Sequence, residues 1–455
     1  MSKLEFRAAA AIGLLYIIRM LGLFMVLPVL PLLADSLSDA TPFLIGIAMG
    51  VYGLSQAVLQ IPLGLLSDKL GRKAVIAGGL IVFVIGSLVA GTADSVYGII
   101  AGRFLQGCGA IASTLMALIS DATRVENRSK AMAMVGMSIG ASFGISLVIG
   151  PLINEHAGWQ GVFLFSAASG IAGLLVLFGV VPSIRLPVKN PEVNINPARF
   201  GEIISDGRLL IVTLGVFMLH YLLMSSFLAF PHLFRLTGEI ADSEHHLIYF
   251  WTLFSTFVLM GPFMWLSDKP GMAKPMLAVF ITLLAAALLV MANAMTFYPV
   301  IAGLVLFFMG FNLMEVLLPS TVSKIAPAGG RGTAMGIYST AQFAGAFAGG
   351  AVGGLLMQQW DISHLMYFNA GVCGVWFLLT VTMKQPGNYS TRIVQISPDD
   401  ELTDKERTDA LLSVNGVVDV VVLEKEALAY LKVDEDKFDD SALAGMGFRR
   451  ETATA

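Results

Sequence analysis

The amino-acid sequence predicts an all-α polytopic membrane protein of twelve transmembrane helices in two six-helix halves, followed by a small α+β domain. Three observations predict this fold class. Of the 455 residues, 56% are hydrophobic and only 13% are charged, whereas soluble domains carry about 25% charged residues. Apolar stretches follow one another from Ala8 to Met383, and each is close to the roughly 20 residues that a helix needs to cross a bilayer. From residue 385 onward charges are frequent, and no apolar stretch is long enough to span.

The predicted spans fall into two sets of six. The first set is 8–33, 43–66, 74–92, 96–119, 131–154 and 159–182, and the second is 209–233, 246–267, 274–294, 297–321, 333–357 and 362–383. The first stretch is too long for a signal peptide and contains Arg19, so we interpret it as a span. The proline-containing segment between the sets is a linker. We therefore divide the chain into an N-terminal half (1–182), a cytoplasmic linker (183–208), a C-terminal half (209–384) and a cytoplasmic domain (385–455).

The distribution of basic residues predicts the orientation. Sixteen lysines and arginines fall in loops on one side of the predicted spans, and only Arg235 falls on the other. Because cytoplasmic loops carry the excess of basic residues, both termini and the linker are predicted to be cytoplasmic. This pattern is typical of a multi-pass protein of the cell inner (cytoplasmic) membrane.

The two halves share short sequence repeats. The segment LSDKLG at 66–71 recurs as LSDKPG at 266–271, an offset of 200 residues. The segment NRSKAM at 127–132 is echoed by GRGTAM at 330–335. Two halves related by a repeat are a transporter architecture, in which the substrate cavity lies at the interface between the halves.

Three motifs resemble those of the major facilitator superfamily. The loop GLLSDKLGRK at 64–73 resembles the family's cytoplasmic loop motif, and RFLQGCG at 103–109 resembles its fourth-span motif. Glycines of span five, ending in Gly150–Pro151, resemble the motif of its antiporter branches. Over nearly all of residues 1–384 the chain is similar to the drug/proton antiporter-like branch. The resemblance implies a secondary active transporter that exports a small molecule in exchange for protons by alternating access.

The resemblance also implies a conformational lock on the cytoplasmic side. In the family, the carboxylate equivalent to Asp68 lies near the N-terminal end of span eleven, and the arginine equivalent to Arg72 lies against Asp121. A helix N-terminus stabilises a nearby anion by about 0.3–1 kcal/mol when exposed. Such a lock would favour the outward-open state, although these charges are also explained as topology signals. The predicted lock residues are Gly64, Asp68, Gly71, Arg72, Lys73, Asp121, Arg128, Asp268 and Arg331.

Span five carries candidate gating residues. They are Gly140, Gly144, Gly150 and Pro151. Small residues let helices approach closely, and in a moving transporter they also permit bending and sliding.

Ionisable residues inside the predicted spans are candidates for the substrate and proton pathway. Arg19 and Arg103 each carry an insertion cost of about 2.5–3.5 kcal/mol, so each should face a water-filled cavity or a partner. Glu315 is the only carboxylate well inside a predicted span. Desolvation favours its neutral form, which makes it the first candidate for proton binding. The alternative is a structural partner of Arg19 or Lys324.

Uncharged and imidazole side chains complete the predicted pathway. They are Asn312, His220, Tyr221, Gln56, Gln60, Gln342 and Asn369. Interhelical hydrogen bonds are the alternative interpretation of these polar residues. The better-known drug/proton antiporters have acidic residues in span one, where this chain has Arg19. An anionic or polyol-like substrate is therefore an equal expectation.

Several kinds of protein are not supported by the sequence. Cys108 and Cys373 lie inside apolar stretches, where they are expected to pack rather than bind metal. No P-loop is present, so neither an ATP-driven pump nor another enzyme is predicted, and no cofactor is expected. A net charge of −4 gives no indication of nucleic acid. The expected partners are a small-molecule substrate, protons and the lipid bilayer.

The C-terminal domain is predicted to have a ferredoxin-like βαββα order. Its predicted strands are 391–396, 417–423 and 427–433, and its predicted helices are 403–413 and 436–444. The run NGVVDVVV resembles heavy-metal-associated domains, but their Cys-x-x-Cys is replaced by Ser397–Asp400. A regulatory or dimerising module and a folding appendage both remain open, as do a tail partner and self-association.

Two further functions stay open at this stage. One is an uncoupled or importing carrier of sugars or anions. The other is a transporter-derived sensor that signals through its tail. Substrate identity is not predicted by the sequence.

Overall fold

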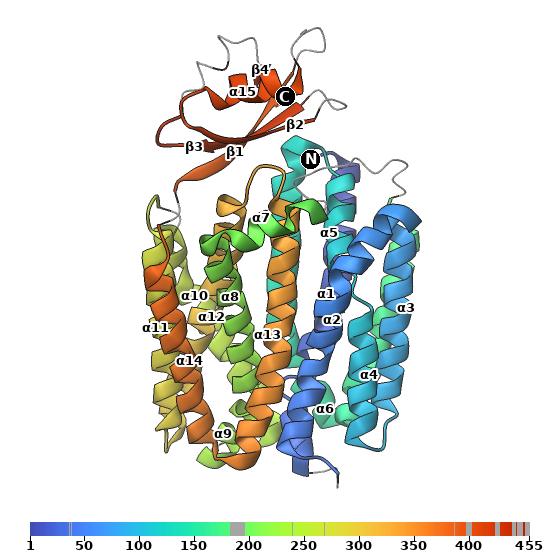
Figure 1. Ribbon diagram of the computed structural model, residues 1–455. Coiled ribbons are helices and arrows are strands. Elements are labelled where there is room, and N and C mark those ends of the chain that lie inside the picture. Colours follow the sequence, from blue (N-terminus) through green and yellow to red (C-terminus); the bar gives the residue numbers. More distant parts are fainter. Residues whose placement is uncertain are drawn as a thin grey trace.

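The computed structural model describes residues 1–35, 37, 39–182, 196–238, 240–267, 269–385, 387–396, 403–423, 428–438, 443 and 449–450. It consists of a helical bundle with a small sheet domain at one end (Figure 1). Within this part of the chain, eleven helices are long and apolar enough to cross a membrane. The remaining span of the predicted twelve is found inside α6.

Helix α6 (Val125–Gly179) contains two spans. Its 55 residues would reach about 80 Å as one straight helix, more than twice the hydrocarbon core. The chain instead turns at Gly158, where φ is +66°. Both ends of α6 lie near the start of α1, because Glu5 accepts a hydrogen bond from the Arg124 amide and Arg7 donates to the Val180 carbonyl. The two spans are therefore antiparallel, and the predicted count of twelve is confirmed.

The other helices follow the predicted order. In the N-terminal half they are α1 (Lys3–Phe24), η1 (Leu30–Asp35), α2 (Pro42–Leu70), α3 (Arg72–Gly91), α4 (Val96–Cys108) and α5 (Ala112–Asp121). After the linker come η2 (Pro197–Arg199), α7 (Phe200–Ser205), α8 (Gly207–Phe227), α9 (Phe230–Thr237), η3 (Asp242–Glu244), α10 (His245–Ser267), α11 (Ala273–Ala292), α12 (Phe297–Ile325), α13 (Arg331–Gln359) and α14 (Ile362–Thr382). Of the predicted linker, residues 183–195 lie outside the described residues.

Spans four and seven are interrupted, which the sequence interpretation missed. Span four ends as α4 and restarts as α5 after Gly109. A Cβ on Gly109 would lie 2.2 Å from the Gly79 carbonyl oxygen, so the chain passes α3 too closely for a side chain. Span seven restarts as α9, with Pro231 in its first turn, where proline is tolerated in a helix.

The repeated loops have the same backbone conformation in both halves. Gly71, between α2 and α3, has φ of +91°, and Gly271, between α10 and α11, has φ of +76°. Both values lie in the region that glycine adopts without a steric penalty. The 200-residue repeat is therefore structural as well as sequential.

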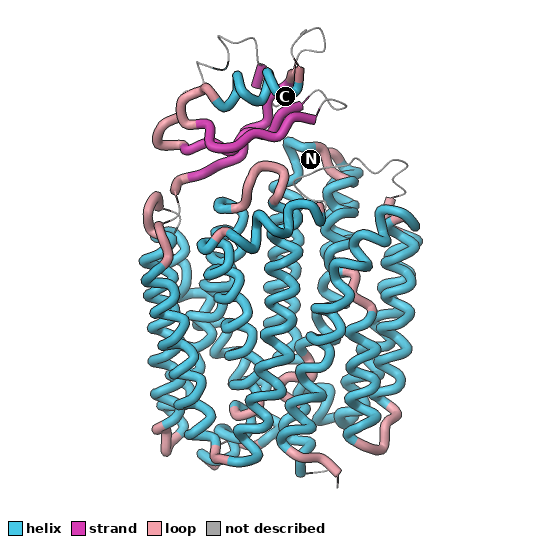
Figure 2. Tube along the Cα trace, in the orientation of Figure 1, coloured by secondary structure: helices cyan, strands magenta, loops and turns pink. Residues whose placement is uncertain are grey.

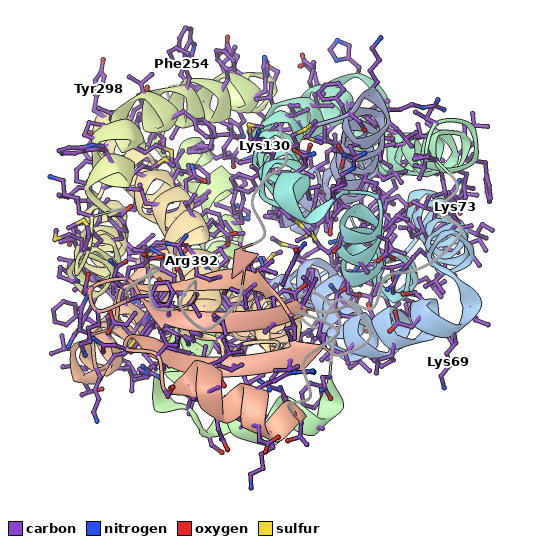
Figure 3. All side chains as sticks on the ribbon, turned by 90° about the horizontal axis from the view of Figure 1, so that it is seen from above. Lys69, Lys73, Lys130, Phe254, Tyr298 and Arg392 are labelled. Carbon is purple, nitrogen blue, oxygen red and sulfur yellow. The ribbon has the colours of Figure 1, made fainter. Side chains whose placement is uncertain are left out.

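Basic loops lie at the end of the bundle that carries the tail domain. The Lys73 ammonium donates to the Val181 carbonyl at the end of α6, and Lys274 donates to the Val381 carbonyl at the end of α14. Figure 3 views the molecule from this end and labels Lys69, Lys73 and Lys130. We refer to it as the cytoplasmic end, in agreement with the predicted orientation.

The tail domain is a four-stranded antiparallel sheet with one described helix (Figure 2). Its elements are β1 (Tyr389–Gln395), α15 (Asp404–Leu412), β2 (Val417–Leu423), β3 (Leu428–Asp434) and β4 (Arg449–Arg450). The strand order β2-β3-β1-β4 is that of a ferredoxin-like sheet, as predicted. The predicted helix 436–444 does not begin at Asp436, which lies in a turn. Residues 439–442 and 444 are outside the described residues, as is Ser397–Asp400.

Helix α15 begins with the predicted capping box. The Thr403 hydroxyl accepts from the Glu406 amide, and the Glu406 carboxylate accepts from the Thr403 amide at 2.8 Å. Hydrogen bonds from Thr403 hold the pKa of Glu406 below its usual value. The cap fixes where the helix starts.

Candidate functional site

The two halves touch at the end of the bundle away from the tail. There α2 and α13 lie side by side (Figure 1), and glycines bring their backbones together. A Cβ added to Gly46 would lie 2.1 Å from the Gly350 carbonyl oxygen, and one added to Gly53 would lie 2.6 Å from the Phe343 carbonyl oxygen. This backbone contact closes the outer side of the interface between the halves.

Toward the cytoplasm the halves separate. A Cβ on Gly144 of α6 would lie 3.8 Å from Leu253 of α10, but Cβ atoms on Gly140 and Gly136, one and two turns nearer the cytoplasm, would meet nothing within 4 Å. A cavity of about 640 Å³ opens between α6, α12 and α13 at this end. The structure is therefore inward-facing.

The predicted gating residues divide into two kinds. Gly140 and Gly144 face the gap between α6 and α10. Gly150 has a packing role, because a Cβ there would lie 2.3 Å from the Met25 carbonyl oxygen. Pro151 follows it inside α6.

An aromatic cluster joins the two halves on the outer side of the cavity. Phe143 of α6 contacts Phe24 of α1 with ring centroids 4.9 Å apart, and it contacts Phe308 and Phe311 of α12 at 5.9 and 5.7 Å. The Phe143 side chain is buried. The sequence interpretation missed this cluster, because phenylalanines in apolar spans carry no signal that separates a lipid-facing ring from one at the interface.

Glu315, His220 and Gln342 are brought together from three helices. His220 Nε2 of α8 lies 3.2 Å from Glu315 Oε1 of α12 and 2.8 Å from Gln342 Nε2 of α13. The side chain of Glu315 is 31% exposed and that of His220 is 8% exposed. Glu315 and Asn312 continue the helix face of Val316 and Pro319, which line the cytoplasmic cavity. Glu315 itself is not among the residues that line that cavity.

This cluster can hold a proton between two of its members. His220 Nδ1 lies 3.2 Å from the Val216 carbonyl oxygen, which can only accept, so Nδ1 carries a proton. A neutral imidazole would then place an acceptor, Nε2, opposite an ionised Glu315. Two acceptors at 3.2 Å repel each other. The Gln342 amide nitrogen, 2.8 Å from Nε2, can only donate and therefore needs Nε2 as an acceptor, so it is a proton on the Glu315 carboxyl group that makes the contact favourable. The partner of Glu315 is thus His220, and not Arg19 or Lys324.

Arg103 is fully buried inside the N-terminal half. Its guanidinium donates to the Gly22 carbonyl of α1 at 3.0 Å, to the Ala48 carbonyl of α2 at 3.3 Å and to the Gln106 side chain at 2.9 Å. These bonds join α1, α2 and α4. Arg103 therefore has the hydrogen-bonding partners that the free-energy cost of placing a charge inside the membrane requires. It lies apart from Glu315.

Arg19 lies beside Arg103 and is 2% exposed. Its guanidinium carbon lies 5.0 Å from the ring centre of Tyr52 and 4.9 Å from that of Phe83. None of its three nitrogens makes a hydrogen bond within the described part of the chain. Cation–π contacts are the stabilisation that the structure gives this charge.

The other predicted pathway residues do not converge on Glu315. Gln56 donates to the Tyr52 hydroxyl at 3.3 Å, and Gln60 accepts from Ser113 through its backbone carbonyl. Asn369 joins α14 to α8 through Ser225 and Ser226. Tyr221 is buried in α8.

Two of the predicted lock residues form a buried ion pair. Arg72 Nε lies 3.1 Å from Asp121 Oδ2, and the two side chains are 8% and 5% exposed. Asp68 Oδ1 lies 2.6 Å from Arg72 Nη1 and is 40% exposed. Gly64 accepts a hydrogen bond from Ser67. Asp268 and the side chain of Arg128 are outside the described residues, and Arg331 lines the cytoplasmic cavity.

The contact between Asp68 and the start of span eleven stays a prediction for the opposite conformation. We expect Asp68→Asn to shift the population further toward inward-open forms, because it weakens a contact available only when the cytoplasmic side closes. Cysteine accessibility from the two sides of the membrane measures the shift. Asp94→Asn, in an exposed outer loop, is the matched control, and unchanged accessibility in Asp68→Asn would contradict the expectation.

Sequence comparison identifies relatives that match most of the chain. The Major Facilitator Superfamily model matches residues 12–350 and, in a second match, 239–402. The inner membrane transport protein YajR of Escherichia coli (strain K12) is 42% identical over 436 residues, covering 94% of each chain. A transporter of Buchnera aphidicola subsp. Schizaphis graminum is 35% identical and covers 85% of this chain and 99% of its own.

Solved structures agree in fold. A bacterial homologue of the human lysosomal transporter Spinster, in an inward-facing and occupied conformation, has a TM-score of 0.68 at 13% identity, covering 84% of this chain and 98% of that one. The human organic anion transporter MFSD10 has a TM-score of 0.62 at 19% identity, covering 83% and 100%. With these matches, twelve spans, a repeated motif loop and a cavity between two halves, the chain belongs to the Major Facilitator Superfamily and is a secondary transporter of the inner membrane.

Proposed function

We propose that this protein exports a small molecule in exchange for protons by alternating access. The observation that carries the proposal is the Glu315–His220–Gln342 cluster, whose geometry favours a protonated Glu315 carboxyl group beside the aromatic cluster. A proton that enters from outside when the outer side is open would be released to the cytoplasm from the conformation seen here.

The geometry gives a reason for coupling. An ionised Glu315 beside a neutral His220 is unfavourable at 3.2 Å, and an unpaired charge in a low-dielectric site is costly. Protonation removes this cost, so the protonated and deprotonated forms favour different surroundings. Proton binding then biases the equilibrium between the two conformations.

The driving force is sufficient for export. One pH unit is worth about 1.4 kcal/mol per proton, which is tenfold in a concentration ratio. The membrane potential adds about 2.3 kcal/mol per charge for each 100 mV.

Proteoliposome flux under an imposed pH gradient tests the proposal, with the solute supplied by a thermal-shift ligand screen on the purified chain. We expect the accumulation ratio of wild-type protein to change about tenfold per pH unit for each proton exchanged. Glu315→Gln should bind the solute but hold the ratio near one at every gradient, because an amide does not titrate. Glu202→Gln, at an exposed cytoplasmic carboxylate, should behave as wild type. Wild-type flux that is indifferent to the gradient would exclude antiport.

A second candidate function is an uncoupled carrier of anions. Arg19 favours it, because a buried guanidinium without a hydrogen-bonding partner attracts negative charge. The same flux measurement separates the two functions, since an uncoupled carrier equilibrates its solute whatever the pH gradient.

A further inference from the structure

We propose that the cytoplasmic cavity is a binding site for a small phosphate-bearing anion, formed jointly by the transport helices and the tail domain. We call this cavity the vestibule. Its volume of about 640 Å³ lies within the usual range of small-molecule pockets. Its lining residues are Met132, Ala133, Val316, Pro319, Ser320, Ser323, Lys324, Ala326, Arg331, Met335, Tyr389, Ser390, Thr391 and Lys432.

The lining has one sign of charge. Lys324 of α12, Arg331 of α13 and Lys432 of β3 are cationic, and none of the lining residues is acidic. Lys324 and Arg331 are exposed to the solvent of the vestibule. Just after β3, the Glu435 carboxylate pairs with Arg392 at 2.7 Å and also accepts a hydrogen bond from Ser390, which lines the vestibule. An anion entering the vestibule therefore meets the positive charges of Lys324 and Arg331.

The hydrogen-bonding groups suit phosphate. Ser320 and Ser323 present hydroxyls from α12, and Tyr389 and Thr391 present them from β1, whereas the Ser390 hydroxyl is donated to Glu435. Phosphate accepts several hydrogen bonds through its oxygens, and arginine binds it through a two-pronged guanidinium contact. Cationic side chains surrounded by hydroxyl donors match the several acceptor oxygens of a phosphate group better than the two oxygens of a single carboxylate.

The tail is held where it completes the site. Lys432 donates to the Ile325 carbonyl and, at 2.9 Å, to the Ala326 carbonyl at the end of α12. Asp419 of β2 accepts from the Ala328 amide at 2.8 Å. These bonds place β1 over the mouth of the vestibule, so the tail supplies part of the lining rather than lying free in solution.

In this conformation the vestibule is lined from both halves. Met132 and Ala133 belong to the N-terminal half, whereas Lys324 and Arg331 belong to the C-terminal half. An anion bound between them stabilises the inward-facing conformation by its differential affinity for that state. This consequence rests on the proposed alternating access, but the binding itself does not.

Binding is tested with inorganic pyrophosphate on the full-length protein in detergent, by calorimetry at constant ionic strength. We expect saturable binding to wild-type protein and at least a tenfold loss of affinity in Lys324→Gln/Arg331→Gln. Lys269→Gln/Lys274→Gln removes two cytoplasmic charges outside the vestibule and should bind as wild type. No binding to wild-type protein, or equal affinity in both double variants, would overturn the site.

Nanodiscs distinguish a soluble ligand from a lipid headgroup. In nanodiscs of zwitterionic lipid alone, pyrophosphate should bind as in detergent. Two results together would assign the phosphate group to the lipid. Phosphatidylglycerol would prevent pyrophosphate binding to wild-type protein, and it would stabilise wild-type protein but not Lys324→Gln/Arg331→Gln. If phosphatidylglycerol has no effect, the ligand is soluble. Both outcomes support a phosphate site.

Spin labels report the conformational consequence. Lys69→Cys and Lys384→Cys, in a Cys108→Ser/Cys373→Ala background, label the cytoplasmic ends of the two halves. Pyrophosphate should increase the population with the longer distance in otherwise wild-type protein. Binding without a change of distance would contradict the alternating-access component while leaving the anion site intact, so the two failures are distinguishable.

Discussion

Gly46→Leu is expected to move the protein out of the inward-facing conformation. The leucine Cβ would lie 2.1 Å from the Gly350 carbonyl oxygen, and its other near neighbours on α13 are also backbone atoms, which cannot rotate away. Overpacking of this kind costs about 1–3 kcal/mol, which corresponds to a shift of roughly 5- to 150-fold in the ratio of two conformations. The spin-label pair at positions 69 and 384 should therefore report a shorter cytoplasmic distance.

The matched control for this prediction is Gly78→Leu. A Cβ at Gly78 of α3 would meet nothing within 4 Å, so this variant adds the same side chain to a span without touching the other half. Gly46→Leu that folds normally and gives an unchanged distance distribution would show that the contact between α2 and α13 does not hold the outer side closed.

Asp121→Asn is expected to cause the larger loss of folding stability among the lock variants. Removing one partner of a buried ion pair costs about 3–5 kcal/mol, because the remaining charge stays buried without compensation. Arg72 is 8% exposed and Asp121 is 5% exposed, so water replaces little of the lost interaction. Asp68 also contacts Arg72 and would still compensate part of its charge, so this range is an upper bound on the loss of folding stability.

Asp68→Asn is the comparison variant. Its side chain is 40% exposed, and an exposed ion pair contributes about 0–1 kcal/mol. Thermal unfolding of both variants in the same detergent measures the difference. Equal melting temperatures would mean that the Arg72–Asp121 contact contributes to conformational equilibrium rather than to the stability of the N-terminal half.

The sequence predicted the number and order of the spans because both follow from the lengths and positions of the apolar stretches along the chain. It missed the interruption after Gly109, since that break results from the approach of α3, a neighbour that the local sequence does not reveal. Gly71 and Gly271 were visible as a repeat, and their shared positive φ gives the physical reason for it.

The candidate site was predictable only in part. Glu315 stood out because a carboxylate inside an apolar span is costly. Its pairing with His220 depends on which faces of α8 and α12 meet, and residue spacing within one helix does not contain that information. Arg103 was expected to need a partner, but apart from Gln106 its partners are backbone carbonyls, which every residue possesses and which therefore carry no sequence signal. The inward-facing state is a property of the assembled halves.

The hydrogen bonds of Lys432 and Asp419 both end on residues 325–328, which belong to the C-terminal half alone. The tail domain is thus attached to one of the two halves, and Figure 3 shows it lying mainly over the green-to-orange helices. Under the proposed alternating access, a donor fluorophore on the tail and an acceptor on the cytoplasmic end of α3 would change their separation with each turnover. Energy transfer between these two fluorophores would therefore report transport without a label inside the membrane.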